Sequence, residues 1–168
     1  MLQTTAPEPC TDPACRGGHA PGERLALADS LCAGRGAQMT ALRRQTLELL
    51  WEHGRPAGAY ELMEALRRRN ARPVAPPTVY RAIDFLIGQG LVAKIASRNA
   101  YVPRIHPERG QTSLFLVCSC CGRSHELEDR RVERLLVEDA TAIGFRISRP
   151  VIELEGVCLH CSEAGGVA

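Results

Sequence analysis

The sequence has few aromatic residues and no long hydrophobic run. Aromatic side chains make up 4% of the 168 residues, although the hydrophobic fraction is an ordinary 45%. The core is therefore expected to consist of Leu, Val, Ile and Ala side chains. No run of about 18 or more apolar residues occurs, so we expect no membrane-spanning helix.

The first residues also lack the features of a secretory signal. Residues 1–9 contain neither a positively charged start nor an apolar stretch. Without export, the eight cysteines are better explained as metal ligands and thiols than as disulfides, because the cytosol keeps thiols reduced. We therefore expect a cytoplasmic protein with one large domain or two small ones.

The net charge of +2 is distributed unevenly along the chain. Residues 35–104 contain twelve basic and five acidic residues, a net charge of +7, whereas residues 1–34 carry −2 and residues 105–168 carry −3. All but one of the cations in the middle segment are arginines. A polyanion would be attracted to this segment. A solvated basic surface without a partner would show the same composition.

Two pairs of cysteines have the spacing of a metal site. Two residues separate Cys118 from Cys121, and two separate Cys158 from Cys161; each pair follows an apolar, strand-like run. Two such pairs can place four thiolates at the corners of a tetrahedron around one Zn²⁺. The 36 residues between the pairs (158 − 121 − 1) can hold a helix and a strand. The metal would then connect the two ends of a small domain.

Hydrophobic periodicity predicts four helices before a hairpin. We expect the helices over residues 23–35, 41–53, 59–70 and 77–88. Thr40 is a plausible N-cap, and Pro77 suits a first helical position. Two short strands are expected over 91–95 and 100–103. This order is that of a winged helix-turn-helix, whose last helix enters the major groove of DNA. A small helical domain without a ligand is the alternative, and the basic charge favours DNA binding.

The last of these helices has two distinct faces. Five apolar residues share the face expected to be buried: Val79, Ala82, Ile83, Leu86 and Ile87. Four other residues point away from that face: Thr78, Arg81, Asp84 and Phe85. Tyr80 lies at the margin between the two faces. Such a division is typical of an amphipathic helix with one exposed face.

The remaining residues predict a smaller unit of strands and one helix. We expect strands over 112–117 and 145–154 and an amphipathic helix over 129–143. Five apolar residues of that helix are spaced for burial: Val132, Leu135, Leu136, Ala140 and Ile143. A unit of this size is marginal for a core by itself. Zinc binding, worth about 10–16 kcal/mol in small zinc domains, would stabilise it.

Two segments resemble a known family. Residues 76–86, Pro-Pro-Thr-Val-Tyr-Arg-Ala-Ile-Asp-Phe-Leu, and the following Gln-Gly-Leu-Val at 89–92 resemble the recognition helix of ferric uptake regulator proteins. Within that family they look most like the zinc uptake regulator branch. Residues 40–43, Thr-Ala-Leu-Arg, resemble the family's Thr-Pro-Gln-Arg helix start, from which Ala41 and Leu42 depart. The two cysteine pairs match the family's structural zinc site.

The resemblance covers Glu23 to Cys161 and implies a homodimeric, metal-responsive transcription factor rather than an enzyme. The implied fold is α+β, an N-terminal winged helix-turn-helix domain followed by a small C-terminal α/β dimerisation domain with a Cys₄ zinc site. The expected divisions are a flexible tail (1–21), the DNA-binding domain (22–103), a hinge (104–110) and the zinc-containing dimerisation domain (111–164). Its structural zinc, one ion per protomer, would be held by Cys118, Cys121, Cys158 and Cys161.

The implied partner is a double-stranded DNA operator with an inverted repeat, bound by one dimer or two. No small-molecule substrate is implied. Carried over by position, Tyr80 and Arg81 would read bases in the major groove with Thr78 beside them, and Tyr60 and Arg43 would contact the backbone. An arginine can donate two hydrogen bonds to guanine, and a tyrosine ring can pack on a thymine methyl group. Partial burial of Tyr80 and simple solvation of Arg81 are the alternatives.

The family's second, regulatory metal site is only partly represented. Zinc sensors of this family usually build it near the hinge from histidines, a cysteine and a carboxylate. Ala93, Arg104 and Gln111 stand where relatives often have His, Cys and His, and only Glu126 keeps a carboxylate. The remaining candidates for a regulatory zinc are His106, His125 and Glu126, and His106 is favoured because it lies at the hinge. Less favoured candidates are Cys10, Cys15, His19, Cys32 and Cys120.

Three functions follow from these observations. The first is a zinc-dependent repressor of zinc-uptake genes. The second is a family member that senses iron, peroxide or thiol redox state, for instance through Cys120, with a purely structural zinc. The third is a zinc or cysteine-histidine enzyme that uses His160 beside Cys161. Four cysteines close the coordination sphere, whereas a catalytic zinc keeps an open position, so we expect no enzyme.

Overall fold

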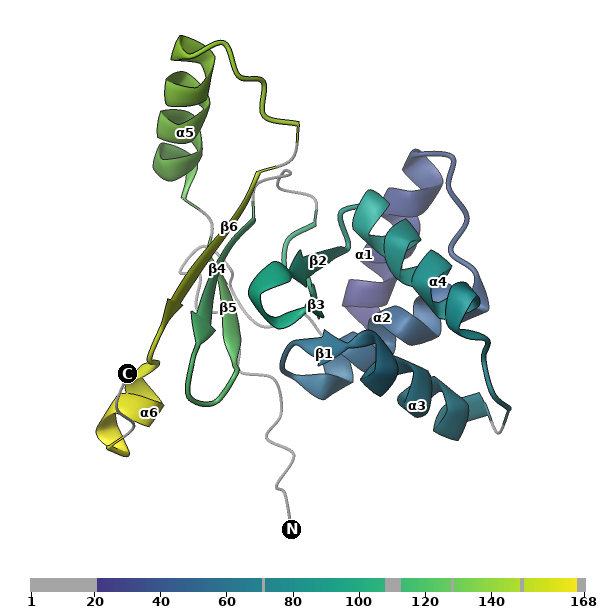
Figure 1. The fold of residues 1–168 in the computed structure, drawn as a ribbon. Helices are drawn as coiled ribbons and strands as arrows, with labels where there is room; N and C mark the ends of the chain where they lie inside the picture. The colour runs from purple at the N-terminus through teal and green to yellow at the C-terminus, as the bar shows by residue number, and fades with distance from the viewer. Residues whose placement is uncertain (1–20, 71, 108–112, 128, 149, 166–168) are drawn as a thin grey trace. The chain divides into compact units, whose positions relative to one another are not determined.

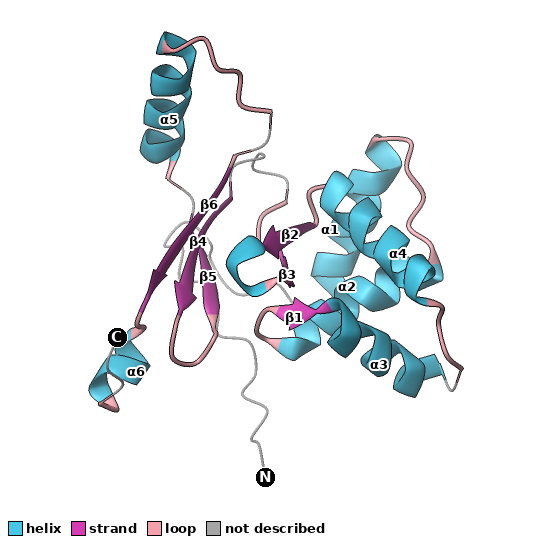
Figure 2. Cartoon of the chain, in the orientation of Figure 1, coloured by secondary structure: helices cyan, strands magenta, loops and turns pink. Residues whose placement is uncertain are grey.

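The computed structural model of the chain describes residues 21–70, 72–107, 113–127, 129–148 and 150–165. The chain divides into two compact units, Met1–Glu108 and Arg109–Ala168. Both units combine helices with strands (Figure 2), which confirms the α+β class. Among the described residues, no helix combines the length and apolar character that a membrane crossing requires. Apart from Pro21, the predicted tail lies outside the described residues.

Four helices build most of the first unit (Figure 1). They are α1 (Pro21–Gly34), α2 (Ala41–His53), α3 (Ala59–Asn70) and α4 (Pro76–Gly88). The predicted bounds of α2 and α3 are confirmed, and α1 and α4 begin within two residues of their predicted starts. Thr40 precedes α2 in extended conformation, as an N-cap does, and Gly54 ends that helix with φ 66°. Pro76 and Pro77 occupy the first positions of α4, where a missing N–H is no loss.

The apolar faces of the four helices share one aliphatic core. Its helical members include Ala28, Cys32, Leu47, Leu50, Leu62, Leu66, Val79, Ile83 and Leu86. Polar contacts fix α2 against α3, because the amides of Gln45 and Asn70 exchange hydrogen bonds of 3.0 and 3.1 Å. Arg69 of α3 also pairs with Glu48 and Glu52 of α2, at 3.1 and 2.7 Å. The burial of Val79, Ile83 and Leu86 turns the opposite face of α4 toward solvent.

A three-stranded antiparallel sheet completes the first unit. Its order is β1 (Ala57–Gly58), β3 (Ala100–Pro103), β2 (Val92–Ile95). The β2–β3 pair confirms the predicted hairpin. The turn between them is a short 3₁₀ helix, η1 (Ala96–Arg98), followed by Asn99 with φ 45°, a left-handed conformation in which asparagine is enriched. This arrangement of helices and hairpin is the predicted winged helix-turn-helix.

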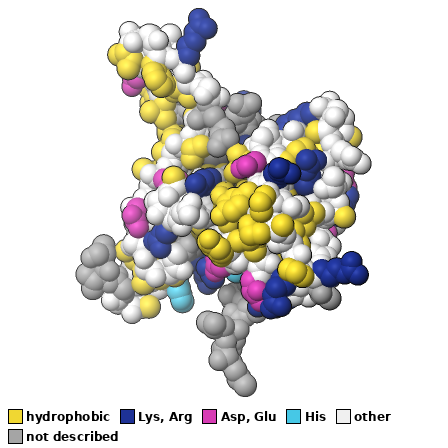
Figure 3. Space-filling model, turned by 45° about the vertical axis from the view of Figure 1, so that its right-hand side comes forward, with side chains coloured by type: hydrophobic (Ala, Val, Ile, Leu, Met, Phe, Trp, Pro, Cys, Tyr) yellow, Lys and Arg dark blue, Asp and Glu magenta, His cyan; other side chains and the backbone are white. Residues whose placement is uncertain are grey.

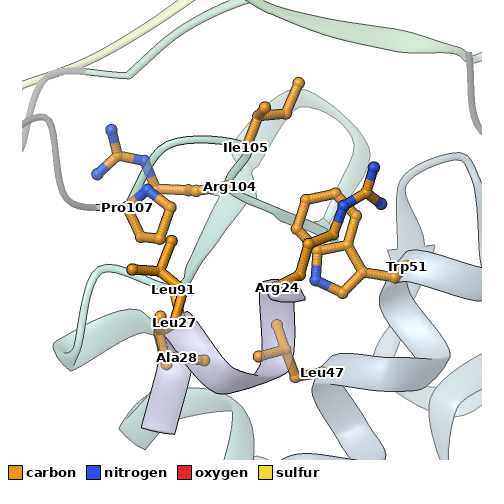
Figure 4. Close-up of a pocket in the computed structure, with 9 residues that line it drawn as sticks. All are labelled: Arg24, Leu27, Ala28, Leu47, Trp51, Leu91, Arg104, Ile105 and Pro107. Carbon is orange, nitrogen blue, oxygen red and sulfur yellow. The ribbon is translucent and has the colours of Figure 1, made fainter. Parts of the chain in front are cut away.

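The chain after β3 stays packed in the first unit as far as the structure describes it. The backbone N–H of Arg104 donates to the carbonyl of Leu91 at 2.9 Å, and Arg104 and His106 are both 4% exposed. A cavity of about 10 Å³ beside this segment (Figure 4), room for about one water, is lined by Arg24, Leu27, Ala28, Leu47, Trp51, Leu91, Arg104, Ile105 and Pro107. The described residues of the predicted hinge, 104–107, therefore belong to the first unit.

The second unit is a three-stranded sheet with a helix inserted before its last strand. The order is β5 (Ser124–Leu127), β4 (Ser113–Cys118), β6 (Val151–Gly156). Strands β4 and β5 form an antiparallel hairpin, and β4 and β6 run parallel. Helix α5 (Arg130–Ala142) lies between β5 and β6 in the sequence, and the short helix α6 (Leu159–Glu163) follows β6. The predicted strand-helix-strand order is confirmed.

The predicted strand over 145–154 is wrong in its position. Strand β6 begins at Val151 and ends at Gly156. Gly144 has φ 75°, and Pro150 directly precedes the strand. Proline has no N–H to donate to a ladder and is confined to strand starts and edges. The apolar residues before it therefore gave a false strand signal.

The predicted burial of the α5 stripe is also wrong for the single chain. Leu135, Leu136 and Ile143 are 56%, 40% and 82% exposed, and Figure 3 shows hydrophobic side chains along this helix at the upper left of the view. The helix itself is confirmed, and the N-cap Asp129 accepts a hydrogen bond from the N–H of Arg131 at 2.8 Å. The amphipathic pattern is real, but the described residues of the second unit do not cover it.

Candidate metal centre and nucleic-acid interface

The two cysteine pairs meet at one edge of the second sheet. Strands β4 and β6 are parallel, and Cys118 at the end of β4 is in register with Gly156 at the end of β6. Parallel strands end at the same edge, so the residues that follow both strands arrive at the same place. The N–H of Ser119 donates to the carbonyl of Gly156 at 2.8 Å and extends the pairing beyond β4.

Each cysteine pair lies on a tight backbone turn. Gly122 has φ 74°, a conformation that glycine adopts at no steric cost, and its N–H donates to the carbonyl of Cys118 at 3.0 Å. Cys158 is the N-cap of α6, and the N–H of Ser162 donates to its carbonyl at 2.9 Å. The first turn of α6 brings Cys161 back beside Cys158.

The four sulfur atoms converge as a metal site requires. The Sγ atoms of Cys118, Cys121, Cys158 and Cys161 all lie within 4.8 Å of one another, and all four cysteines are free thiols. The Sγ atoms of Cys121 and Cys158 are 3.8 Å apart. In a tetrahedral site with Zn–S bonds of about 2.3 Å, neighbouring sulfurs lie about 3.8 Å apart. This donor set fits a zinc ion, and it leaves no open coordination position.

Backbone N–H groups make one of these thiols acidic. The N–H groups of Cys121 and Cys158 donate to the sulfur of Cys118 at 3.5 and 3.4 Å, and they lower the pKa of Cys118 to about 6. Burial raises the pKa of Cys121, and the neighbouring thiol of Cys158 raises the pKa of Cys161. A second thiolate in so small a space is unfavourable without a cation. A divalent ion would reverse that preference.

The candidates for a regulatory metal do not join this cluster. His125 and Glu126 lie on β5, and His106 is buried in the first unit. Within either unit taken by itself, the described residues form no second group of three His, Cys, Asp or Glu side chains able to hold a metal. Cys120 is exposed, and Cys32 is fully buried in the core.

The structure also places the residues that stand at the family's usual ligand positions. Ala93 lies in β2 and is 6% exposed, opposite Val102. Arg104 is buried, and a guanidinium cation cannot ligate a metal. Gln111, like Cys10, Cys15 and His19, lies outside the described residues. The residues at two of the expected positions therefore do not fit a metal.

The exposed face of α4 carries the residues expected to read DNA bases. Thr78 and Arg81 are exposed, and Tyr80 is 38% exposed. No carboxylate of the described residues pairs with Arg81. On the opposite face Val79 and Ile83 are fully buried, because residues three and four apart share one side of a helix. The division into two faces predicted from the sequence is confirmed.

The other two candidates for DNA contact lie on neighbouring helices. Tyr60, the second residue of α3, is 80% exposed. Beside it the carboxylate of Glu61 accepts a hydrogen bond from the N–H of Gly58 at 2.8 Å, which lowers the pKa of Glu61 and fixes the start of the helix. Arg43, in the first turn of α2, lies over the ring of Phe85 with 3.5 Å to the centroid.

Ion pairs neutralise part of the basic segment. Carboxylate partners are present for several of its arginines, among them Arg44, Arg55, Arg67 and Arg69. By contrast, Arg68, Arg72 and Lys94 pair with no carboxylate in the part of the chain that the structure describes. The positive potential of this unit therefore comes from fewer side chains than the composition suggests.

Comparison with known proteins assigns the chain to a family. The model of the ferric uptake regulator family matches residues 34–155. The chain belongs to the ferric uptake regulator family. It is 38% identical over 143 residues to the zinc uptake regulation protein of Escherichia coli, a match that covers 84% of this chain and 82% of that protein. The predicted resemblance to this family, and to its zinc uptake regulator branch, is confirmed.

Solved structures of ferric uptake regulator relatives share the fold. A zinc uptake regulator complexed with zinc and DNA is 35% identical, with a TM-score of 0.82 over 89% of this chain and 99% of that chain. Holo XcZur is 38% identical, with a TM-score of 0.78 over 86% of this chain and 99% of that chain. The match therefore extends over nearly the whole length of both relatives.

Two features of this member of the family were not predicted from its sequence. The contact of Arg43 with Phe85 joins residues 42 positions apart (85 − 43), a separation at which no periodicity gives a signal. The hydrogen bond from Gly58 to Glu61 did have a signal in the sequence, because an acceptor three residues after an N-cap is the spacing of a capping box.

Proposed function

We propose that this member of the ferric uptake regulator family is a zinc-responsive transcriptional repressor of zinc-uptake genes, and that it binds an inverted-repeat operator as a homodimer. The exposed face of α4 carries the proposal, because Tyr80 and Arg81 project from it in a chain that matches a DNA-bound zinc uptake regulator. The protein is a regulator and not an enzyme.

Each residue on this surface has a distinct role in binding. Arg81 donates two hydrogen bonds to a guanine, and the ring of Tyr80 packs on a thymine methyl group. Thr78, at the start of the same helix, contacts a neighbouring base or phosphate. Tyr60 and Arg43 contact the sugar-phosphate backbone and fix the register of α4 in the groove.

Residues 22–103 form the DNA-binding domain and 111–164 the dimerisation domain. The segment 104–110 connects them as the hinge, and its first residues, 104–107, pack on the first unit. A second copy of the chain covers the apolar face of α5 that one chain leaves exposed. A two-fold dimer places two winged helices on the two half-sites of an inverted repeat. Operators with two inverted repeats would take two dimers.

The four cysteines hold one structural zinc per protomer. When bound, zinc cross-links the ends of β4 and β6. A closed site with four thiolates exchanges poorly and does not sense, so the response to zinc uses a second site. Its candidate ligands are His106 in the first unit and, separately, His125 and Glu126 in the second. Such a ligand acts through its difference in affinity for two conformations of the dimer. The protein works in the cytoplasm, where the operator is.

Metal-dependent DNA binding tests the proposal. The operator duplex is first selected from a random-sequence pool with the zinc-loaded protein. We expect added zinc to raise the affinity of chelator-treated protein for that duplex about 5- to 150-fold, and His106→Ala to reduce this gain. One zinc per protomer that survives mild chelation, with DNA affinity indifferent to added metal, would contradict the sensor role.

The same assay separates the alternative functions. Ferrous iron in place of zinc would raise the affinity of an iron sensor. Peroxide would release zinc and lower DNA affinity in a thiol-based sensor, and Cys120→Ser would weaken that effect. A zinc sensor responds to neither treatment.

A further inference from the structure

Arg43 is held by uncharged groups, in contrast to its neighbour in the sequence. Arg44 pairs with the carboxylate of Asp29. Arg43 instead lies over the ring of Phe85, with 3.5 Å from the guanidinium carbon to the ring centroid, and donates through Nη1 to the carbonyl of Gln38. Neither contact neutralises its charge. Arg43 is therefore fixed in position and remains a full cation.

Phe85 belongs to the exposed side of α4. It follows Arg81 by four residues and Thr78 by seven, one and two helical turns, so the three side chains lie on one side of the helix. Its ring packs against the edge of the core and remains partly exposed. The stacked guanidinium of Arg43 thus lies beside the surface that carries Arg81.

Among the described residues, no protein group accepts from most of the hydrogen-bond donors of Arg43. A guanidinium has five N–H donors in its plane, and the carbonyl of Gln38 takes one of them. The aromatic ring meets the flat face of the group and takes none. The remaining N–H groups of the guanidinium can donate to two oxygens of one phosphate.

We propose that Phe85 is a positioning residue for DNA binding, whose ring holds Arg43 in the orientation that grips a backbone phosphate beside the major groove. This inference rests on the proposed function and deepens it. Phe85 reads no base; it removes rotamer freedom that Arg43 would otherwise lose on binding. The partner is the phosphate backbone of double-stranded DNA.

The test measures DNA affinity as a function of salt for a small set of variants. The probes are the selected operator duplex and a random-sequence duplex of equal length. Because a phosphate contact carries no sequence information, Phe85→Leu should weaken binding to both probes alike. We expect a loss of about 5- to 30-fold for the dimer, which has two such contacts. Phe85→Trp, which stacks at least as well on a cation, should keep wild-type affinity.

A double-mutant cycle separates positioning from a purely structural role. Arg43→Ala should reduce the slope of log affinity against log salt by about 2, because the dimer loses two phosphate contacts. In the Arg43→Ala background, Phe85→Leu should have no further effect beyond about twofold. Arg44→Ala, which removes an already neutralised cation, should change the slope by much less.

Additive losses from Arg43→Ala and Phe85→Leu would overturn the positioning role, as would equal affinities of the Trp and Leu variants. Melting temperatures recorded for every variant show whether Phe85→Leu acts through the stability of the fold. A wild-type protein that binds the selected and random duplexes equally would instead overturn the proposed function. The two failures are therefore distinct.

Discussion

Individual arginines of the basic segment differ in the charge they present to a partner. Arg44 and Arg69 are engaged by carboxylates, whereas Arg81 projects from the exposed face of α4 without such a partner among the described residues. An ion pair with a protein carboxylate already satisfies part of the hydrogen-bonding capacity of a guanidinium. Arg81 therefore keeps the hydrogen-bonding capacity that reading a base requires.

Replacement of Arg81 by alanine should relax sequence specificity. A bidentate contact with guanine discriminates by about 1–3 kcal/mol, so Arg81→Ala should weaken binding to the selected operator about 5- to 150-fold per half-site. Binding to random DNA should fall far less. A mobility-shift assay at fixed ionic strength compares the two probes, with Arg44→Ala as the control. Equal losses on both probes would show that Arg81 reads no base.

Asp129 gives the second unit a defined dependence on pH. Its carboxylate accepts hydrogen bonds from the guanidinium and the N–H of Arg131, both at 2.8 Å, which hold its pKa at about 2. Because the folded-state pKa is lowered, the stabilisation is complete above about pH 4, the ordinary value for aspartate. It is lost as the pH falls through about 2.

The variant Asp129→Asn keeps an N-cap acceptor and removes the charge. The wild type should therefore melt at a higher temperature than this variant above about pH 4, and the difference should vanish toward pH 2. Thermal melts followed by circular dichroism at several pH values measure it. A difference that stays constant over this range would mean that the charge of Asp129 does not stabilise α5.

At the scale of helices and strands, the sequence predicts the long periodic helices and the β2–β3 hairpin, and it misses two short strands. Helices α2 and α3 have the predicted bounds because their apolar residues repeat over three turns. Strands β1 and β5, of two and four residues, were not predicted. So short a strand is specified by its partner β3 or β4 and not by its own periodicity.

For the candidate sites too, the sequence predicts what local patterns specify and misses what depends on packing between segments. The four cysteines were predicted from local spacing, because each turn brings two ligands together within four residues. The exposed face of α4 was predicted from helical periodicity. The contact of Arg43 with Phe85 depends on how α2 packs on α4 and could not be predicted from either segment alone.

The two cysteine turns should act as one metal-binding element. Cys158→Ser should reduce the zinc content from one per protomer toward zero and destabilise the second unit, since zinc binding is worth about 10–16 kcal/mol in small zinc domains. The matched control is Cys120→Ser, which changes an exposed thiol outside the cluster. Metal analysis after mild chelation measures both. Loss of zinc from Cys120→Ser would contradict a closed site of these four sulfurs.

For the molecule as a whole, the exposed apolar face of α5 indicates a partner. Leu135, Leu136 and Ile143 are all at least 40% exposed in the single chain. Contiguous apolar surface of this kind marks a protein–protein interface. A second copy of the same chain fits this requirement, since dimers of this kind use the same surface on both subunits.

A charge on this face should dissociate the dimer. Leu136→Glu would bury an unpaired carboxylate, and we expect the dissociation constant of the dimer to rise about 100-fold or more. Affinity for the two-half-site operator should fall with it. Sedimentation equilibrium measures the assembly, and Thr141→Glu, on another side of α5, is the control. A Leu136→Glu protein that remains dimeric would place the interface elsewhere.

The parallel register of β4 and β6 bears on how tightly zinc is held. In an unfolded chain, four-cysteine binding would have to close a loop of 36 residues (158 − 121 − 1) against its conformational entropy. In the folded chain six residue pairs, from Ser113 with Val151 to Cys118 with Gly156, close that loop. The strand ladder and the zinc therefore close the same loop and should stabilise each other. Leu154→Pro, which disrupts the ladder at a residue that is not a metal ligand, should therefore weaken zinc binding.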